Sequence, residues 1–357
     1  MGNLYYKSDI ISRIPILGQN IIRNGDFRLA QRGTSLTQGG GTSVDYNLDR
    51  WKVFNTTDAT FTMSQEEDSP TYIQSGFQTD YCVQMTPTIV DTPLVSGEYF
   101  LLSQPVEDSE MQSHINNGTG LFTLSFWLKA TKTGVTCVRV IMYGAGLKIL
   151  KEFTVSSSNT WEKHTWTFEM PHTTDWGGLG VNFCLGNGGP YDSPTDTWTN
   201  LSYHSTSNQV NHLDNVSNIF KLAQVQLEAG DTATPFKGIS FWDELRLAQT
   251  HFCKTYDVDV APGSTTSDGR QEGLVSGTSF TSVTVSFPTE MRVVPTVALY
   301  DNVGNSGAVT EGNLGNNQAA TAGYVGQRGF GFLNKGGGSN WTAGEWMDFH
   351  YTADASN

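Results

Sequence analysis

Apolar and polar residues alternate with a period of two along much of the chain between Ile21 and Phe236. Successive side chains of a β-strand point to opposite faces, so an apolar residue at every second position predicts a half-buried strand. Five such runs are separated by turns rich in Gly, Asn and Ser, which predicts an antiparallel β-sandwich. Their apolar positions are Leu124, Phe126 and Leu128, then Val138, Val140 and Met142, then His164, Trp166, Phe168 and Met170, then Val181, Phe183 and Leu185, and last Ala223, Val225 and Leu227.

A helix is predicted directly after this sandwich. Ser240 and Asp243 have the spacing of a capping box, in which a serine side chain accepts a hydrogen bond from the third residue of the helix. The apolar residues that follow recur at intervals of four, three, four and four, the period of one helix face. We expect this helix to cap the first domain and to lead into the second. Its apolar positions are Phe241, Leu245, Ala248, Phe252 and Tyr256.

A second, smaller β-domain is predicted beyond a segment rich in Gly, Ser and Thr at residues 261–269. Its alternating positions are Val283, Val285 and Phe287, then Val297 and Leu299, then Met347, Phe349 and Tyr351. The predicted fold class is therefore all-β, with a β-sandwich, one capping helix and a second smaller β-sandwich. The boundaries we predict are an arm at 1–22, the first sandwich at 23–238, the helix and linker at 239–260, and the second sandwich at 261–357.

The N-terminal arm carries an apolar patch around Pro15. Proline restricts its own backbone and that of the preceding residue, so a helix across the patch is disfavoured. An apolar arm of this kind either packs against its own domain or attaches the domain to a partner. The attachment residues would be Ile10, Ile11, Ile14, Ile16 and Leu17.

Charge and composition exclude several kinds of partner. The chain has 357 residues, with 21 Lys and Arg against 35 Asp and Glu, a formal net charge of −14. A nucleic-acid binder needs clustered cations to neutralise phosphates, so we expect no nucleic-acid partner. No apolar run approaches the roughly 18 residues of a membrane span, and no export signal is visible, so we expect neither membrane insertion nor secretion.

The cysteines give no sign of a metal site. Cys82, Cys137, Cys184 and Cys253 are far apart and form no C-x-x-C pair, so a zinc site is not expected. We predict four reduced, buried thiols in a protein made in a cytoplasm.

No local motif of a catalytic class is present in the chain. It has no G-x-S-x-G, no H-E-x-x-H, no phosphate-binding glycine loop and no G-x-G-x-x-G before a helix. A carboxylate pair brought together from distant strands would leave no such pattern. We expect a protein that is not an enzyme.

Aromatic residues gather in the polar segment 171–210, among Gly, Asn, Asp, Ser and Thr. Sugar rings stack on flat aromatic rings while Asp, Asn and Gln bind their hydroxyls, so this composition predicts a saccharide platform. The same aromatics would also suit loop anchoring or burial at a subunit contact, and the sequence leaves these alternatives open. The platform residues would be Trp176, Tyr191, Trp198 and Tyr203, extended by Trp127 on the polar face of its strand and Tyr143 on a mixed face.

Three segments form a recognisable set. They are Ile21-Ile22-Arg23-Asn24-Gly25-Asp26-Phe27 with Ala30-Gln31-Arg32-Gly33, then Leu48-Asp49-Arg50-Trp51, then Val225-Gln226-Leu227-Glu228-Ala229-Gly230-Asp231-Thr232-Ala233-Thr234-Pro235-Phe236 with Glu244-Leu245 and Phe252-Cys253-Lys254-Thr255-Tyr256. Together they resemble a domain of tailed-bacteriophage tail-fibre proteins. That domain is similar in turn to the jelly-roll carbohydrate-binding modules of extracellular polysaccharide hydrolases.

The resemblance implies a jelly roll over 23–238. It also implies a structural calcium, for which such modules carry an acidic ligand on their last strand. This chain has Leu222-Ala223-Gln224 there, so we expect no cofactor.

For function, the resemblance implies a virion structural protein made in the host bacterial cytoplasm. It would be a tail-fibre or spike subunit, a trimer, that joins other virion proteins through its arm and attaches to host surface polysaccharide. Two alternatives stay open. One is a capsid decoration or head-fibre protein with a mainly structural role, and the other is a free carbohydrate-binding module.

Overall fold

The computed structural model describes residues 19–356 except 42, 112–119, 172, 174, 176, 190–192, 278 and 338–340. The chain divides into two compact units, Met1–Arg28 with Ser35–Gly238, and Leu29–Thr34 with Ile239–Asn357. The predicted attachment residues Ile10, Ile11, Ile14, Ile16 and Leu17 lie outside the described residues.

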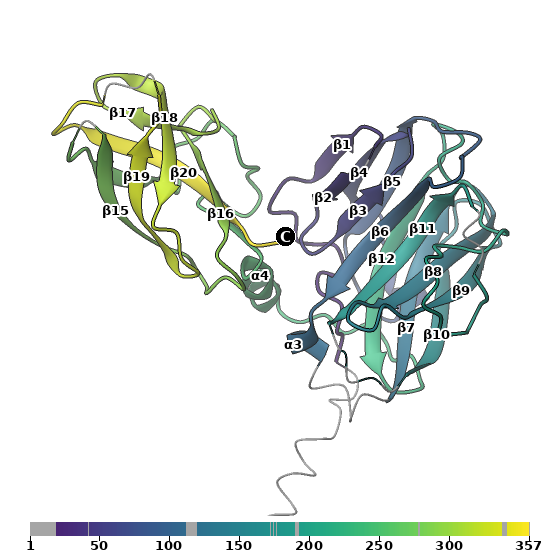
Figure 1. Cartoon of the computed structure of the whole chain (residues 1–357). Coiled ribbons are helices and arrows are strands. Elements are labelled where there is room, and N and C mark those ends of the chain that lie inside the picture. The colour runs from purple at the N-terminus through teal and green to yellow at the C-terminus, as the bar shows by residue number, and fades with distance from the viewer. Residues whose placement is uncertain are drawn as a thin grey trace, which may run out of the picture. The chain divides into compact units, whose positions relative to one another are not determined.

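The first unit is an antiparallel sandwich of two six-stranded sheets (Figure 1), so the predicted all-β jelly-roll fold class is confirmed. Sheet I has the order β1 (Ser35–Gln38), β4 (Thr60–Glu66), β5 (Cys82–Ile89), β12 (Phe220–Ala229), β7 (Gly120–Ala130) and β10 (Glu162–Met170). Sheet II has the order β2 (Ser43–Tyr46), β3 (Lys52–Asn55), β6 (Tyr99–Val106), β11 (Leu179–Asn187), β8 (Gly134–Met142) and β9 (Lys148–Val155).

The core of this unit lies between the two sheets, where aromatic rings from facing strands pack edge to face. Phe126 of β7 meets Phe183 of β11 with ring centroids 5.0 Å apart, and Phe61 of β4 meets Phe100 of β6 at 4.7 Å. The predicted alternation is confirmed in β10, where buried and exposed side chains alternate toward the end of the strand. Strands β11 and β12 are instead buried on both faces along almost their whole length.

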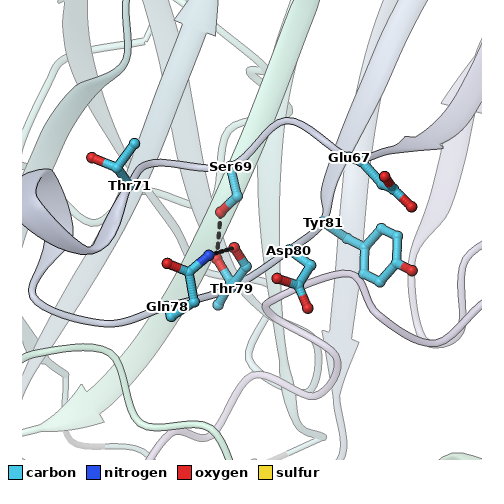
Figure 2. A pocket seen from close by; sticks show the side chains of 7 residues that line it. All are labelled: Glu67, Ser69, Thr71, Gln78, Thr79, Asp80 and Tyr81. Carbon is cyan, nitrogen blue, oxygen red and sulfur yellow. Dashed lines mark hydrogen bonds between the residues drawn. The ribbon is translucent and has the colours of Figure 1, made fainter.

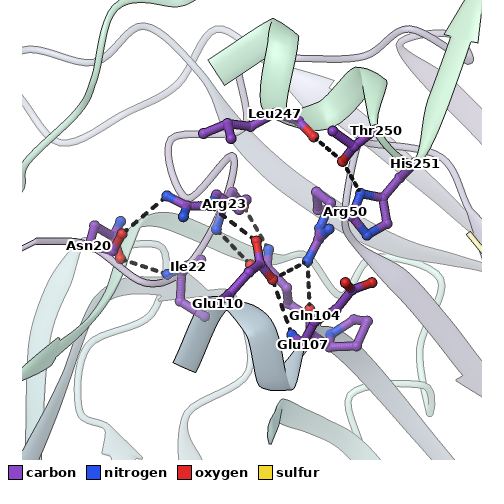
Figure 3. Close-up of polar contacts among 11 residues, drawn as sticks. Asn20, Ile22, Arg23, Arg50, Gln104, Glu107, Glu110, Leu247, Thr250 and His251 are labelled. Carbon is purple, nitrogen blue, oxygen red and sulfur yellow. Dashed lines mark hydrogen bonds and ion pairs between the residues drawn. The ribbon is translucent and has the colours of Figure 1, made fainter. Parts of the chain in front are cut away.

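The chain just before β1 is fixed to sheet II by a polar network (Figure 3). The side-chain amide of Gln104 accepts a hydrogen bond from the backbone N–H of Arg23 and donates one to its carbonyl, both at 2.7 Å. Glu110, in the short helix α3 (Asp108–Met111), pairs with Arg23 at 3.3 Å and with Arg50 at 2.8 Å. Arg50 is only 4% exposed, so it is a structural cation rather than a free surface charge.

The three segments that resemble the tail-fibre domain (the phage-like segments) meet around Asn24 and Gly25. The Asn24 side chain donates to the carbonyl of Asp49 at 3.0 Å, and the indole N–H of Trp51 donates to the carbonyl of Asn24 at 3.0 Å. The backbone N–H of Val225 donates to the carbonyl of Gly25 at 2.8 Å. These residues therefore join the start, the Trp51 region and the last strand of the sandwich.

The turn after β12 is organised by a buried carboxylate. Glu228 is 1% exposed and accepts hydrogen bonds at 2.8 Å from the backbone N–H and the hydroxyl of Thr234 and from the side-chain amide of Gln226. Gln226 in turn accepts from the backbone N–H of Lys237 at 2.8 Å. This part of the third segment, from Gln226 to Phe236 together with Lys237, is thus a structural turn.

We expect Glu228→Gln to lower the free energy of unfolding of the first unit by about 2 kcal/mol. The neutral amide has one acceptor oxygen in place of two, and its hydrogen bonds are weaker than those to a carboxylate. Urea unfolding followed by tryptophan fluorescence measures this. Asp231→Asn, an exposed acid in the same turn, is the matched control and should leave the midpoint unchanged. Equal effects from the two substitutions would contradict the assigned role.

The second unit has its own core and one connected set of eight strands. The long strand β20 (Trp346–Asp354) pairs with β13, β14, β16 and β17. The core of the second unit contains the buried side chains of Phe349, Met347 and Leu333. The strands are β13 (Phe252–Lys254), β14 (Gln271–Leu274), β15 (Phe280–Ser286), β16 (Thr296–Tyr300), β17 (Ala308–Glu311), β18 (Gly315–Gly323), β19 (Gly329–Lys335) and β20.

Helix α4 (Phe241–Gln249) begins as predicted and ends earlier than predicted. The Ser240 hydroxyl accepts from the backbone N–H of Asp243 at 3.2 Å, which confirms the cap. The predicted continuation to Tyr256 is wrong, because Phe252 already begins β13, which pairs with the C-terminal strand β20. Apolar spacing cannot reveal a strand partner that lies about a hundred residues away. The helix also belongs to the second unit rather than to the first.

The segment Leu29–Thr34 also counts with the second unit, whereas the predicted boundaries place it in the first sandwich. The side-chain amide of Gln31 donates to the carbonyl of Phe252 at 3.1 Å. Arg32 pairs with Asp354 at 2.9 Å, and its guanidinium lies 3.8 Å from the ring centre of Phe252. These are long-range contacts, so a linear division of the sequence misses them.

All four cysteines are free and buried, and burial raises the pKa of Cys82 to about 12. Within the described part of the chain, no helix combines the length and apolar character needed to cross a membrane.

Candidate functional site

The predicted aromatic platform is only partly within the described residues. Trp176 and Tyr191 lie outside them. Trp198 is half-buried, donates its indole N–H to the carbonyl of Glu169 at 2.8 Å, and meets the ring of Phe168 at 6.3 Å. These contacts fix the loop to the end of β10, which is the anchoring role that the sequence left open.

Trp127 lies on the polar face of its strand, where neighbouring side chains cover it. It is 8% exposed and packs with Cys82, Ala223 and the half-buried Trp161 on the face of sheet I that points away from the core. Strand β7 lies between β12 and β10, so Ala223 and Lys163 flank Trp127 on this face. Tyr143 and Tyr203 lie elsewhere, at the outward face of sheet II. The structure therefore does not bring the predicted platform residues that it describes onto one surface.

Sheet II carries an unusual row of polar side chains on its outward face. Strand register places Lys52, Ser103, Asn182 and Arg139 side by side across four neighbouring strands. Phe183 points into the core, so this row points away from it. Ser103 is 0% exposed, so this part of the row is fully covered.

Arg139 is held from one side only. One terminal nitrogen donates to the carbonyl of Tyr203 at 2.9 Å and to Nδ1 of His204 at 2.8 Å. The His204 ring is stacked on Tyr99, with centroids 4.0 Å apart. Because a guanidinium only donates, Nδ1 of His204 must accept, so the histidine is neutral and carries its proton on Nε2.

The positive charge of Arg139 acts on two neighbouring groups, His204 and Lys148. Burial, together with the positive charges of Arg139 and Lys148, lowers the pKa of His204 to about 3. Burial and the neighbouring Arg139 also lower the pKa of Lys148. Neither Arg139 nor Lys148 forms an ion pair with any carboxylate in the part of the chain that the structure describes. We call Arg139, Lys148 and His204, with Tyr99, Tyr143 and Tyr203, the cationic patch.

Tyr143 forms the exposed part of this patch. Its side chain is 41% exposed, and its ring lies over Gly180 of β11. A Cβ at position 180 would lie 2.4 Å from the Tyr143 hydroxyl, so this approach requires glycine.

A pocket of about 430 Å³ lies between the ends of β4 and β5 (Figure 2). Small-molecule sites usually have volumes of roughly 300–1,000 Å³. The lining combines one half-buried aromatic ring with two carboxylates, one amide and three hydroxyls. The lining residues are Glu67, Ser69, Thr71, Gln78, Thr79, Asp80 and Tyr81.

Gln224 of β12 holds the loop that lines the pocket through side-chain hydrogen bonds. The side-chain amide nitrogen of Gln224 lies 3.1 Å from the carbonyl of Phe77, the hydroxyl of Ser75 and the hydroxyl of Thr79. Ser69 and Thr79 also share a hydrogen bond across the pocket floor. The loop that lines the pocket is therefore positioned by buried polar contacts.

Gln224 also stands where the resemblance places an acidic calcium ligand. The oxygens that its amide nitrogen contacts are one carbonyl and two hydroxyls, and no carboxylate of the described residues joins them. Calcium prefers several carboxylate oxygens, so this donor set does not suit it. The amide nitrogen of Gln224 contacts the oxygens that a cation at this place would contact.

Sequence reasoning missed both Arg139 and Tyr81. Arg139 lies in a run predicted as a strand, but nothing in the sequence shows that its outward face is covered or that Arg139 has no ion pair among the described residues. Tyr81 adjoins a strand whose alternation is interrupted by polar residues, so no pattern marked it. Only strand pairing brings these residues to their sites.

No protein-family model matches the chain, and no curated protein matches its sequence. Solved structures to which it is similar include a putative sugar-binding protein from Bacteroides thetaiotaomicron, with 11% identity, a TM-score of 0.37, and coverage of 59% of this chain and 100% of that one. TmCBM61 in complex with β-1,4-galactotriose matches with 14% identity, a TM-score of 0.30, and coverage of 60% and 100%. The enzymatically active domain of tailspike protein 4 of bacteriophage CBA120 matches with 13% identity and a TM-score of 0.31. That match covers 59% of this chain and 21% of the tailspike chain.

Proposed function

We propose that this chain is a non-enzymatic structural protein of a tailed-bacteriophage particle, a tail-fibre or spike subunit whose first unit binds saccharide on the host surface. The phage-like segments of the sequence support the particle. The pocket lined by Tyr81 supports the saccharide, and it is the observation that carries this part of the proposal.

The pocket suits a ligand rich in hydroxyls. Glu67 and Asp80 offer acceptor oxygens, and the Gln78 amide both donates and accepts. Tyr81 presents a flat ring on which the CH face of a sugar can stack. The lining has no aliphatic side chain, so an apolar ligand would leave these polar groups without partners.

We expect Tyr81→Ala to weaken binding of a neutral polysaccharide about tenfold, which is the effect of losing about 1.4 kcal/mol of stacking and contact energy. Retardation in native gels containing β-1,4-galactan, xylan or dextran measures this. Trp198→Ala is the matched control, because the Trp198 indole anchors a loop; it should lower stability and leave retardation unchanged. Loss of binding in Trp198→Ala alone would move the site to the predicted loop platform.

The particle assignment has its own experiment. Immunogold labelling of intact particles of the encoding phage should place the chain on the tail. Label on the head, with loss of capsid stability in its absence, would favour a decoration protein instead, and no label on either part would reject a virion role. Mass measurement of the purified chain tests the trimer, and the absence of reducing-sugar release from polysaccharides it binds tests the non-enzymatic assignment.

A further inference from the structure

The strongest unexplained feature of the first unit is the buried guanidinium of Arg139. Arg139 is 7% exposed and lies on β8 of sheet II. A buried guanidinium usually has an anionic partner, because removing its charge from water is costly. Among the described residues, no carboxylate fills this role.

The hydrogen bonds of Arg139 leave one edge of the guanidinium without a partner among the described residues. Both bonds made by its side chain start from the same terminal nitrogen. Its Nε is buried without a partner, and the second terminal nitrogen bonds to none of the described residues. This Nε edge is the fork that binds the two oxygens of a carboxylate side by side.

Lys148 provides a second cation at the same place. It lies opposite Ile141, two residues from Arg139 on the same face of β8 and β9. It is half-buried and has no ion pair among the described residues. In a chain of net charge −14, two unpaired cations side by side are not explained by overall composition.

Aromatic side chains frame these cations. Tyr143 is 41% exposed on one side, and the stacked pair of Tyr99 and His204 lies on the other. Flat rings next to an unpaired guanidinium suit a ligand that has both a sugar ring and an anionic group.

We propose that the cationic patch binds the carboxylate of an acidic saccharide, a uronic-acid unit, with Arg139 and Lys148 as its anion-binding residues. This rests on the proposed function and adds to it a second subsite, separate from the pocket at Tyr81. Tyr143 contacts the sugar ring, and Lys148 contacts the carboxylate from the solvent side.

The experiment compares polymers that differ in charge, with the full chain. Retardation is measured in native gels containing polygalacturonate, alginate or hyaluronan, with β-1,4-galactan as the neutral polymer and dextran sulfate as the sulfated one. The wild-type chain should bind at least one polyuronate more tightly than dextran sulfate. Lys148→Gln should weaken that binding about tenfold and leave binding to galactan unchanged.

Two further variants make the result specific. Lys163→Gln removes the same charge from an exposed position of β10 in the other sheet and should leave polyuronate binding unchanged. Arg139→Gln should weaken polyuronate binding more than Lys148→Gln does. If Arg139→Gln fails to fold, as far-ultraviolet circular dichroism would show, Lys148→Gln against Lys163→Gln decides the question.

The outcomes separate the two proposals. Binding of galactan without binding of any polyuronate overturns the acidic subsite and leaves the saccharide function intact. Binding of no saccharide polymer overturns both. Equal or tighter binding of dextran sulfate, or competition by millimolar inorganic phosphate, shows a general anion site and overturns the uronic-acid assignment. Equal effects of the two lysine variants would mean that only net charge matters, and would also overturn it.

Discussion

Replacing Gly25 by alanine should destabilise the first unit by about 3 kcal/mol, at the upper end of what overpacking usually costs. A Cβ at this position would lie 2.1 Å from the carbonyl oxygen of Val225 and 3.3 Å from the Asn20 side-chain nitrogen. The neighbour is backbone, which is itself tied to Gly25 by a hydrogen bond of 2.8 Å. The clash therefore cannot be relieved by turning a side chain.

Chemical unfolding of the full chain, followed by tryptophan fluorescence, measures this change, because Trp51 lies buried beside the affected contact. Gly39→Ala is the matched control. A Cβ there would find only the Thr60 hydroxyl oxygen, at an ordinary 3.9 Å, so the midpoint should stay within error of the wild type. A Gly25→Ala protein as stable as the Gly39→Ala protein would show that the two segments are not packed as described.

The position of Gly25 explains what the phage-like segments can and cannot predict. Gly25, Trp51 and Glu228 are all part of the framework that closes the sandwich. A set of residues with this role predicts a fold, and the two-sheet architecture is confirmed. It carries no information on the ligand, because none of these residues lines the pocket or belongs to the cationic patch.

Strand prediction succeeded where one face is buried and the other is exposed. The alternation in β10 and β15 is visible in sequence because the exposed positions are polar. Strands β5 and β6 escaped prediction. Strand β6 is buried on both faces along most of its length, and Pro105 lies near its end. The helix beginning at Phe241 was predicted from its local cap, whereas its end depends on pairing with β20 at the far end of the chain.

The candidate sites depend still more on distant pairing. The cationic patch combines one residue each of β6, β8 and β9 with three residues outside the strands, and no local spacing joins them. The three outside the strands are Tyr143, Tyr203 and His204. The pocket at Tyr81 depends on Gln224, which lies about 140 residues further along the chain. Aromatic content alone led to Trp127 and Trp198, and both are used for packing.

Acidification from pH 7.5 to pH 5 should lower the free energy of unfolding of the first unit by about 4 kcal/mol, through two buried histidines. Burial, with a smaller effect of Lys132, lowers the pKa of His212 to about 3, although Asp214 opposes this. The pKa of His204 is lowered to about 3 by burial and by the positive charges of Arg139 and Lys148. His212 is 1% exposed, and its Nε2 lies 2.8 Å from the Thr136 hydroxyl.

The sign follows from comparing the two states. An unfolded histidine takes up a proton near pH 6.5, whereas these two stay neutral in the folded chain until about pH 3. The stability that depends on keeping these two histidines neutral is fully present above pH 6.5 and is lost as the pH falls toward 3. A pH of 5 lies about 1.5 units below the pKa of an unfolded histidine. Protonation at pH 5 therefore stabilises the unfolded state by about 2 kcal/mol per histidine.

Substitution separates these histidines from other acid effects. His212→Gln and His204→Gln should each reduce the difference between unfolding free energies at pH 7.5 and pH 5 by about half, whatever each does to stability at pH 7.5. Urea unfolding at the two pH values gives this difference directly. An unchanged difference in both variants would mean that the folded chain accepts these protons, and that neither ring is held in a buried, neutral state.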